Sequence, residues 1–219
     1  MSTLLLRLAG PMQSWGTDSK FDVRRTGREP SKSGVIGLAA AALGVPRQDR
    51  DTLAELARLR FGVRVDREGT VMRDYQIAKA YRSSKNPDTY VTHRYYLADA
   101  AFTAGLESED REKLERIGAA LREPAFPLYL GRRSCPPAGK IFLEITDMPL
   151  EEALRSAYGK YTRLLLDAAE GEPGGLVRDV PLSFDPARRE YAYRRVTEEL
   201  CNAAADHDPM AELEDLICI

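Results

Sequence analysis

The chain has 219 residues, of which 43% are hydrophobic and 30% are charged, a balance typical of a soluble globular protein with one large or two small domains. It holds no run of about 18 or more apolar residues, and its opening residues become charged too soon for a signal peptide, so we expect a cytoplasmic protein without membrane contact. The three cysteines lack C-x-x-C spacing and the two histidines complete no zinc set. We therefore expect reduced structural thiols, no metal and no other cofactor.

The net charge of −2 argues against a protein that coats nucleic acid without specificity. The distribution is uneven, since residues 1–100 carry 17 Lys and Arg against 11 Asp and Glu, whereas residues 101–219 carry 15 against 23. This asymmetry predicts a local polyanion site in the first half of the chain and a separate surface for another partner in the second.

The first expected element is a buried strand over residues 2–9, and a long connection without clear periodicity follows over residues 11–30. This connection combines an amide, a hydroxyl and an aromatic ring with several arginines, the groups that single-stranded RNA recognition requires. The candidates are Gln13, Ser14, Trp15, Arg24, Arg25 and Arg28. The alternative for Trp15 is a role as a core anchor, because large aromatic side chains are mostly buried.

A helix is predicted to begin near Lys32 and to end near Leu43. Ser31 or Ser33 can cap its first turn, and Gly44 supplies its exit. Its body carries no charge after Lys32, so it should be packed on most of its faces. Its N-terminus offers N–H donors and a partial positive charge, which with Lys32 and Ser33 suit a backbone phosphate. The alternative is an ordinary capped core helix.

A second amphipathic helix is predicted within residues 47–60, capped by Asp49 or Asp51. Residues 61–65 alternate as in a half-buried strand, and the turn at Glu68-Gly69 is expected to lead back into a strand over residues 71–79. We therefore expect these two strands to pair as a hairpin.

The polar residues 82–89 predict the turn of an extended hairpin arm, or else a mobile surface loop. Residues 95–103 then resume as a strand in the body of the protein.

A third helix is expected within residues 108–124, because acidic residues mark its first turn and Pro124 its end. A short strand over residues 126–130 then leads into the turn Gly131-Arg132-Arg133-Ser134. Glycine lets the backbone approach a ligand and paired arginines bind phosphate, so this turn is a candidate RNA site. The alternative is a solvated loop.

The element order reduces to β-α-β-β-α-β when the second helix is treated as an insert and residues 71–94 as an elaboration. We therefore expect an α+β protein built on a ferredoxin-like sandwich of the RNA-recognition type, with two helices on one face of a four-stranded antiparallel sheet. This domain is assigned to residues 1–139, including a hairpin at about 74–95. Residues 140–219 are expected to form a small β-rich appendage with an acidic tail. Its strands are predicted at 141–145, 161–166, 176–182 and 190–196, and a short helix at 150–157.

No nucleophilic triad, carboxylate pair or phosphate loop is visible as a motif. A metal-independent ribonuclease needs less, namely a general acid or base and a cation, and His93 beside Arg94 could supply these groups. A lone histidine without a positioned partner is usually structural or on the surface, so we predict a protein that is not an enzyme.

Four blocks along residues 3 to about 197 carry a family resemblance. They are Met12 to Gly16, Pro30 to Gly37, Tyr129 to Pro137 and Arg178 to Asp185. Together these blocks resemble the CasD (Cas-five) family, subunits of the type I-E CRISPR interference complex Cascade that belong to the RAMP superfamily.

The resemblance implies a ferredoxin-like RAMP domain with a protruding β-hairpin thumb. It implies a protein that binds the 5′ handle of the crRNA, caps the backbone filament in antiviral defence, and contacts the large subunit and a backbone subunit. Such a protein would contact target DNA only indirectly, through the complex. It also implies no catalytic duty.

By matching block, the handle-binding candidates are Gln13, Ser14, Trp15, Lys32, Ser33, Arg132, Arg133 and Ser134. Residues 81–94 match the thumb, with Arg82, Lys85, His93 and Arg94 as its candidates, whereas Arg24, Arg25 and Arg28 remain a physical inference. Two other readings stay open. One is an endoribonuclease that processes precursor crRNA, and the other is an assembly cap whose RNA contacts are incidental.

Overall fold

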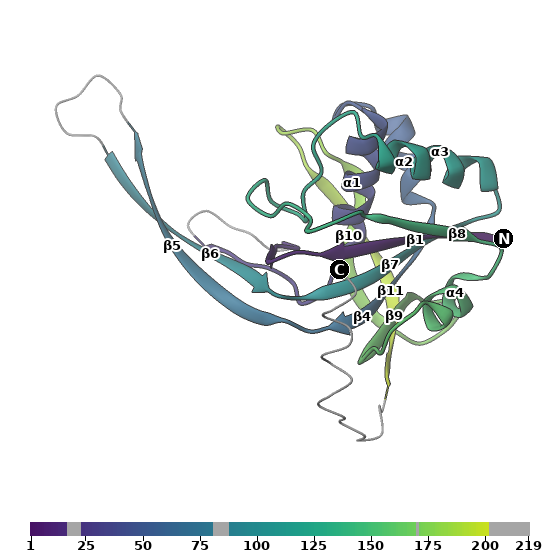
Figure 1. Ribbon diagram of the computed structural model, residues 1–219. Helices are drawn as coiled ribbons and strands as arrows, with labels where there is room; N and C mark the ends of the chain where they lie inside the picture. The colour runs from purple at the N-terminus through teal and green to yellow at the C-terminus, as the bar shows by residue number, and fades with distance from the viewer. Residues whose placement is uncertain (17–22, 81–87, 170, 202–219) are drawn as a thin grey trace.

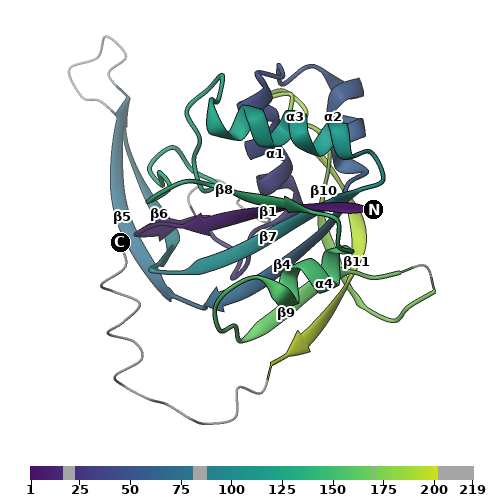
Figure 2. The same ribbon diagram turned by 45° about the vertical axis from the view of Figure 1, so that its right-hand side comes forward.

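The computed structural model describes residues 1–16, 23–80, 88–169 and 171–201 (Figure 1). A seven-stranded antiparallel sheet runs through the body in the order β10-β11-β9-β4-β7-β1-β8. Helices α1, α2 and α3 cover one face of this sheet and α4 lies on the other, while the hairpin β5–β6 projects away from the body (Figures 1 and 2). The protein is therefore α+β, as predicted. Among the described residues, no helix is long and apolar enough to cross a membrane.

The centre of the sheet consists of β1 (Ser2–Ala9), β4 (Arg60–Arg67), β7 (Ala101–Ser108) and β8 (Phe142–Thr146). Both faces of β1 are buried as far as Leu6, whereas Arg7 is exposed. Leu4, Leu6 and Leu8 belong to the main core with the three helices, whereas Leu5 belongs to a second core with residues of α4. A strand segment that is buried on both faces has a continuous apolar sequence, which explains the run over residues 4–6.

The predicted helix boundaries are confirmed by their caps. Helix α1 (Lys32–Leu43) begins at Ser31, whose Oγ accepts a hydrogen bond from the Gly34 N–H at 3.2 Å. It ends at Gly44, with a φ of 75°. Helices α2 (Arg50–Ala57) and α3 (Arg111–Arg122) begin in the same way at Asp49 and Asp110. Capping is a local interaction, so it can be read from neighbouring residues.

The predicted strand over residues 126–130 is wrong, because no described strand occupies this range. Pro127 lacks the N–H group that a paired strand donates. The chain instead folds into a loop in which the Leu130 N–H donates to the Cys135 carbonyl at 2.7 Å. The edge beside β1 is taken by β8, through pairs such as Thr3 with Thr146.

The predicted pairing of residues 61–65 with 71–79 is also wrong. Strand β5 (Thr70–Ala80) pairs with β6 (Asp88–Ala98), and β4 lies between β7 and β9. Gly69 has a φ of 70°, and a side chain there would lie 2.6 Å from the Ala98 carbonyl oxygen, so the chain turns sharply out of the sheet.

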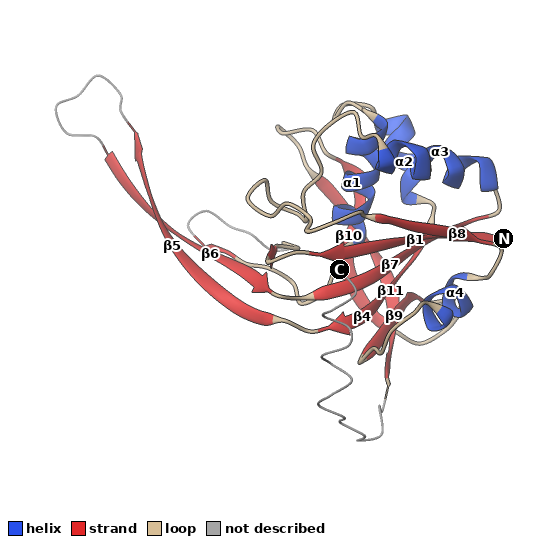
Figure 3. Ribbon diagram, viewed as in Figure 1, coloured by secondary structure: helices blue, strands red, loops and turns tan. Residues whose placement is uncertain are grey.

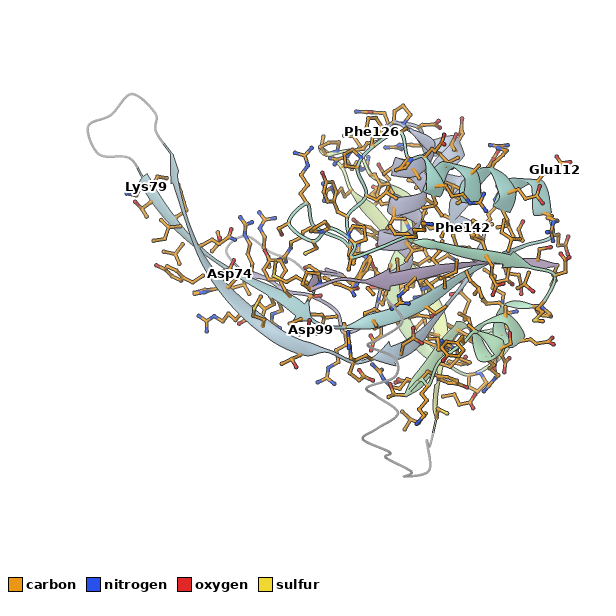
Figure 4. All side chains as sticks on the ribbon, viewed as in Figure 1. Asp74, Lys79, Asp99, Glu112, Phe126 and Phe142 are labelled. Carbon is orange, nitrogen blue, oxygen red and sulfur yellow. The ribbon has the colours of Figure 1, made fainter. Side chains whose placement is uncertain are left out.

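The predicted continuous strand over residues 95–103 is interrupted at Asp99, which has a φ of 57°. This bend separates β6 from β7. The described strands of the hairpin, Thr70–Ala80 and Asp88–Ala98, therefore begin before and end after the predicted bounds of about 74–95. In Figure 4, Asp99 lies at its root, Asp74 part of the way along it and Lys79 near its far end.

Four of the remaining elements agree with prediction in type, namely α4 (Leu150–Ser156), β9 (Arg163–Asp167), β10 (Gly175–Ser183) and β11 (Glu190–Leu200). The very short strands β2 (Met12–Gln13) and β3 (Val23–Arg24) were not predicted. Figure 3 shows α4 apart from the other helices. Strands from both sides of residue 140 share one sheet, because β8 pairs with β1 and β9 with β4. The acidic tail, with His207, lies outside the described residues.

Candidate nucleic-acid interface

A groove of about 650 Å³ lies where α1, the loop over residues 126–133 and the connection between β10 and β11 meet. Small residues of α1 form its floor, among them Ser33, Gly34 and Gly37. Its other lining includes cationic and aromatic side chains. The arginines are Arg47, Arg133 and Arg189, all exposed, and the rings include Phe126, Tyr129, Phe184 and Tyr191. Arginines bind phosphates and aromatic rings stack on bases, so the groove has the chemistry of a single-strand site.

The N-terminus of α1 is already occupied by a carboxylate of the protein itself. The Lys32 N–H donates to Asp179 Oδ2 at 2.7 Å, and Lys32 Nζ forms an ion pair with Asp167 Oδ2 at 2.9 Å. This corrects the predicted phosphate contact of Lys32, because its N–H and its charge are both used inside the protein. Ser33 is half-buried, and of the predicted pair it alone lines the groove.

Gln13 and Trp15 are fully buried, and their polar atoms are paired. Gln13 Nε2 donates to the carbonyls of Leu8 at 3.0 Å and Ala100 at 2.8 Å, and its Oε1 accepts from Trp15 Nε1 at 2.9 Å. The Trp15 ring packs so closely on α1 that a side chain at Gly34 would lie 2.8 Å from it. These contacts correct the predicted base contacts and favour the core-anchor alternative for Trp15.

Ser14 lies beneath the Gly131 turn. It is buried, its N–H donates to the Leu130 carbonyl at 3.0 Å, and its Oγ donates to the Tyr95 carbonyl at 3.3 Å. Gly131 has a φ of 89°, and a Cβ there would lie 1.8 Å from the Ser14 carbonyl oxygen. Only glycine fits this position, because both the backbone angle and the space exclude a side chain.

The two arginines of the turn differ in their contacts. Arg132 donates to the carbonyls of Tyr95 at 3.2 Å and Arg24 at 2.9 Å, and its guanidinium lies 4.9 Å from the centre of the Tyr96 ring. It therefore ties the loop to β3 and β6. Arg133 is exposed and lines the groove.

Ser134 is exposed, and its Oγ lies 3.4 Å from the Tyr96 hydroxyl. Cys135 is buried behind this turn, and burial raises the pKa of its thiol, which fits the predicted reduced, structural role.

The arginines of the long connection lie near the root of the hairpin. Arg24 belongs to β3, which pairs with β6 so that Arg24 stands opposite Arg94. The side chains of Arg24, Arg25 and Arg28 are all exposed. None of the three lines the groove.

On the hairpin, His93 Nδ1 accepts a hydrogen bond from Arg73 Nη2 at 3.1 Å, and its ring centre lies 5.6 Å from that of Tyr75. Its partner is thus a cation and not the carboxylate that usually orients a catalytic histidine. Arg94 is half-buried, and its Nε has no hydrogen-bond partner among the described residues. The other thumb candidates, Arg82 and Lys85, lie outside the described residues.

Residues 3–197 match the model of the family described as CRISPR-associated protein (Cas_Cas5). The chain belongs to the Cas5 family. It is 39% identical to the CRISPR system Cascade subunit CasD of Escherichia coli strain K12 over 157 residues, which cover 65% of this chain and 70% of that protein.

Two solved structures resemble this Cas5-family chain over nearly its whole length. A chain described as the crystal structure of a Cas protein is 44% identical, with a TM-score of 0.72 and coverage of 90% of this chain and 94% of that one. A chain from a CRISPR RNA-guided surveillance complex is 33% identical, with a TM-score of 0.75 and coverage of 90% and 89%.

Several groove residues of this Cas5 protein were not predicted from the sequence. They are Arg47, Phe126, Tyr129, Phe184, Arg189 and Tyr191. A usable signal existed for two of them, because Phe184 and Arg189 flank the Asp185-Pro186 turn and glycine- or proline-rich turns carry many binding residues. The signal was incomplete, since nothing local indicates that this turn meets α1.

Proposed function

We propose that the chain is a crRNA-binding subunit of a Cascade-type CRISPR interference complex, and that its groove holds the 5′ handle of the crRNA. One observation carries the assignment of the site. Exposed arginines and aromatic rings from three separate parts of the chain meet in a single groove. The similarity to a Cascade subunit and to a chain of an RNA-guided surveillance complex supports the choice of ligand.

The chemistry of the groove suits a single strand that is bound mainly through backbone and stacking. Each base stacked on an aromatic ring contributes about 1–3 kcal/mol. Each phosphate contact of an arginine releases counterions and makes the affinity depend on salt. The proposed basic surface also includes the exposed residues Arg24, Arg25, Arg28 and Ser134. Arg132, the neighbour of Arg133 of the groove, donates to the carbonyls of Arg24 and Arg25, which supports this extension.

We further propose that the hairpin is the thumb of this subunit and that it contacts protein as well as RNA. Val71, Tyr75 and Ile77 on β5 are 53%, 57% and 53% exposed. An isolated hairpin with uncovered apolar residues is marginally stable in water, so a partner surface over it is favourable. The proposed partners are a backbone subunit and the large subunit, in a complex that reaches target DNA through the crRNA.

The proposal includes a ferredoxin-like core at the capping end of the filament. The order β8-β1-β7-β4, with α1 after β1 and α3 after β7, supports this core, because it is the order of a β-α-β-β-α-β sandwich. Under this proposal β8 serves as its fourth strand.

The site is tested with fluorescently labelled single-stranded RNA that carries the repeat-derived 5′ handle. Replacing Arg133 and Arg189 together by alanine is expected to weaken binding at least about tenfold. It should also lower the salt slope of binding by about 1.4, since each lost phosphate contact of a single strand removes about 0.7. The matched control replaces Arg58 and Arg116, which are exposed elsewhere, and changes the net charge equally. Equal effects of both pairs would contradict the assigned site.

The alternative function, an endoribonuclease, is tested separately. The purified chain is incubated with repeat RNA in EDTA, and we expect no specific cleavage, because His93 pairs with Arg73 rather than with an orienting acid. Specific cleavage that His93→Ala abolishes would overturn the non-catalytic assignment.

A further inference from the structure

The wall of the groove formed by the β10–β11 hairpin comes from a distant part of the sequence. Phe184, Arg189 and Tyr191 all belong to this wall, and the loop over residues 126–133 forms the opposite one. The Phe184 ring rests on α1, where a Cβ at Gly37 would lie 3.5 Å from it. The width of the groove therefore depends on how the β10–β11 hairpin is attached to α1.

A set of ion pairs makes this attachment, in which Asp179 and Lys32 are buried and Asp167 and Arg194 are partly buried. Asp179 is 1% exposed, and it accepts hydrogen bonds from the Lys32 N–H at 2.7 Å, from Arg194 Nε at 2.6 Å and from Arg194 Nη2 at 2.9 Å. Arg194 Nη1 also donates to Asp167 Oδ1 at 2.7 Å, and Asp167 pairs with Lys32 Nζ. Two carboxylates thus balance two cations between β9, β10, β11 and the first turn of α1.

The backbone of β10 is shaped to present Asp179. Arg178 pairs with Tyr193 and Val180 with Ala192, so Asp179 is the extra residue of a β-bulge. A bulge interrupts the ladder and redirects a side chain. Here the redirected side chain is the Asp179 carboxylate, which accepts a hydrogen bond at the N-terminus of α1. Its neighbour Arg178 is exposed.

Buried two-pronged contacts between arginine and carboxylate fix orientation as well as distance. We propose that Asp179 is a positioning residue of the RNA groove, which holds the β10–β11 wall against α1 so that Arg189 and Tyr191 reach the bound strand. The inference rests on the proposed function, because it takes the crRNA handle as the ligand.

The test is a double-mutant cycle with the labelled handle RNA. In the wild-type background, Arg189→Ala is expected to weaken binding about 5- to 10-fold, as loss of one charged contact does. In the Asp179→Asn background, Arg189→Ala should change the affinity less than about twofold, because the wall no longer holds Arg189 in place. Arg133→Ala, on the opposite wall, should keep its full effect in both backgrounds.

A second measurement needs no RNA. Amide hydrogen exchange over residues 183–191 of the free chain should become at least about tenfold faster in Asp179→Asn, while residues 126–133 stay unchanged. If Asp179→Asn does not fold, Arg194→Lys replaces it, since lysine keeps one ion pair but cannot reach both carboxylates. The same pattern is expected with smaller amplitude.

The matched control is Arg64→Lys. Arg64 is also a buried, ion-paired arginine, but it serves the opposite face of the sheet, where it pairs with Asp66 and donates to carbonyls at the end of α4. This variant should lower stability and leave the handle affinity and the Arg189→Ala effect unchanged.

An undiminished effect of Arg189→Ala beside Asp179→Asn, or unchanged exchange over residues 183–191, would overturn the inference. A wild-type chain that fails to bind the handle would instead overturn the proposed function and, with it, this role of Asp179. The two failures are distinguishable, because only in the second is the Arg133→Ala effect absent as well.

Discussion

The groove and the hairpin are built in opposite ways. Both walls of the groove are attached by buried contacts, one through the Gly131 turn on Ser14 and the other through Asp179 at the end of α1. The hairpin is anchored at its root, whereas farther out Tyr75 and Ile77 are more than half exposed. The difference teaches that both groove walls are already fixed in the free chain, whereas the outer hairpin is not, which is why we propose a ligand for the first and a covering partner for the second.

The largest expected effect comes from breaking the groove at Gly131. Gly131→Ala places a methyl group against the Ser14 carbonyl at a positive φ, so the turn must move. We expect the free energy of unfolding to fall by about 3–4 kcal/mol and the handle affinity to fall at least about tenfold. Urea unfolding and RNA titration measure the two effects.

Gly139→Ala is the control for this substitution, because a Cβ at Gly139 meets nothing within 4 Å. Its effect on stability should stay within about 0.5 kcal/mol. Similar losses in the two variants would mean that the Gly131 turn is not the rigid wall that we describe.

The next effect is expected at Gln13, which lies on β2 and pairs with Leu97 at the root of the hairpin. Gln13→Leu leaves the Leu8 and Ala100 carbonyls and Trp15 Nε1 without their buried partner, and we expect a loss of about 2–3 kcal/mol in urea unfolding. Trp15→Phe removes one of these orphaned groups. The double variant should therefore lose about 1 kcal/mol less than the sum of the single losses, and strict additivity would contradict the hydrogen bond.

Substitutions in the hairpin should weaken assembly with partner subunits and leave the stability of the isolated chain unchanged. Tyr75→Ala with Ile77→Ala removes exposed side chains, so thermal unfolding of the isolated chain should hardly change. Reconstitution with Cascade partner subunits should weaken about tenfold. Tyr158→Ala, which removes a 93% exposed ring elsewhere, is the control and should leave assembly intact.

The smallest effect concerns the root of the hairpin. A hydrogen bond from Arg163 lowers the pKa of Glu68 below its usual value of 4.5. A lowered folded-state pKa gives stability that is present above pH 4.5 and lost as the pH falls through the folded pKa. Glu68→Gln should thus cost less than about 1 kcal/mol at pH 7 and less at pH 3 than at pH 7, as urea unfolding at both pH values would reveal. An equal cost at both would contradict the ion pair.

Much of the fold was predictable because its signals are local. Ser31 and Gly44 mark the ends of α1 through contacts within a few residues. The mainly apolar run over residues 3–8 indicates a buried strand between two cores. The fourth central strand was misplaced, since the competition between residues 126–130 and 142–146 for the edge of β1 is decided by pairing across the whole chain.

The site was predictable only in part for the same reason. Arg133 was found because its turn is visible in the sequence, and it does line the groove. Lys32 was misjudged because Asp179 and Asp167, which use its N–H and its charge, lie far along the chain. Gln13 and Trp15 have the residue types of RNA readers, but burial assigns them to packing. Residue type indicates which interactions a side chain can make, and tertiary contacts decide whether that side chain is exposed to make them with a ligand.

The contact between Lys32 and Asp179 joins residues 147 positions apart. Chains fold from the N-terminus as they leave the ribosome, so α1 is made long before the carboxylate that closes its end. The groove cannot take its final shape until β10 and β11 have been synthesised and have paired. A nascent chain therefore lacks the complete groove, and under the proposed function we expect RNA capture only by the finished subunit.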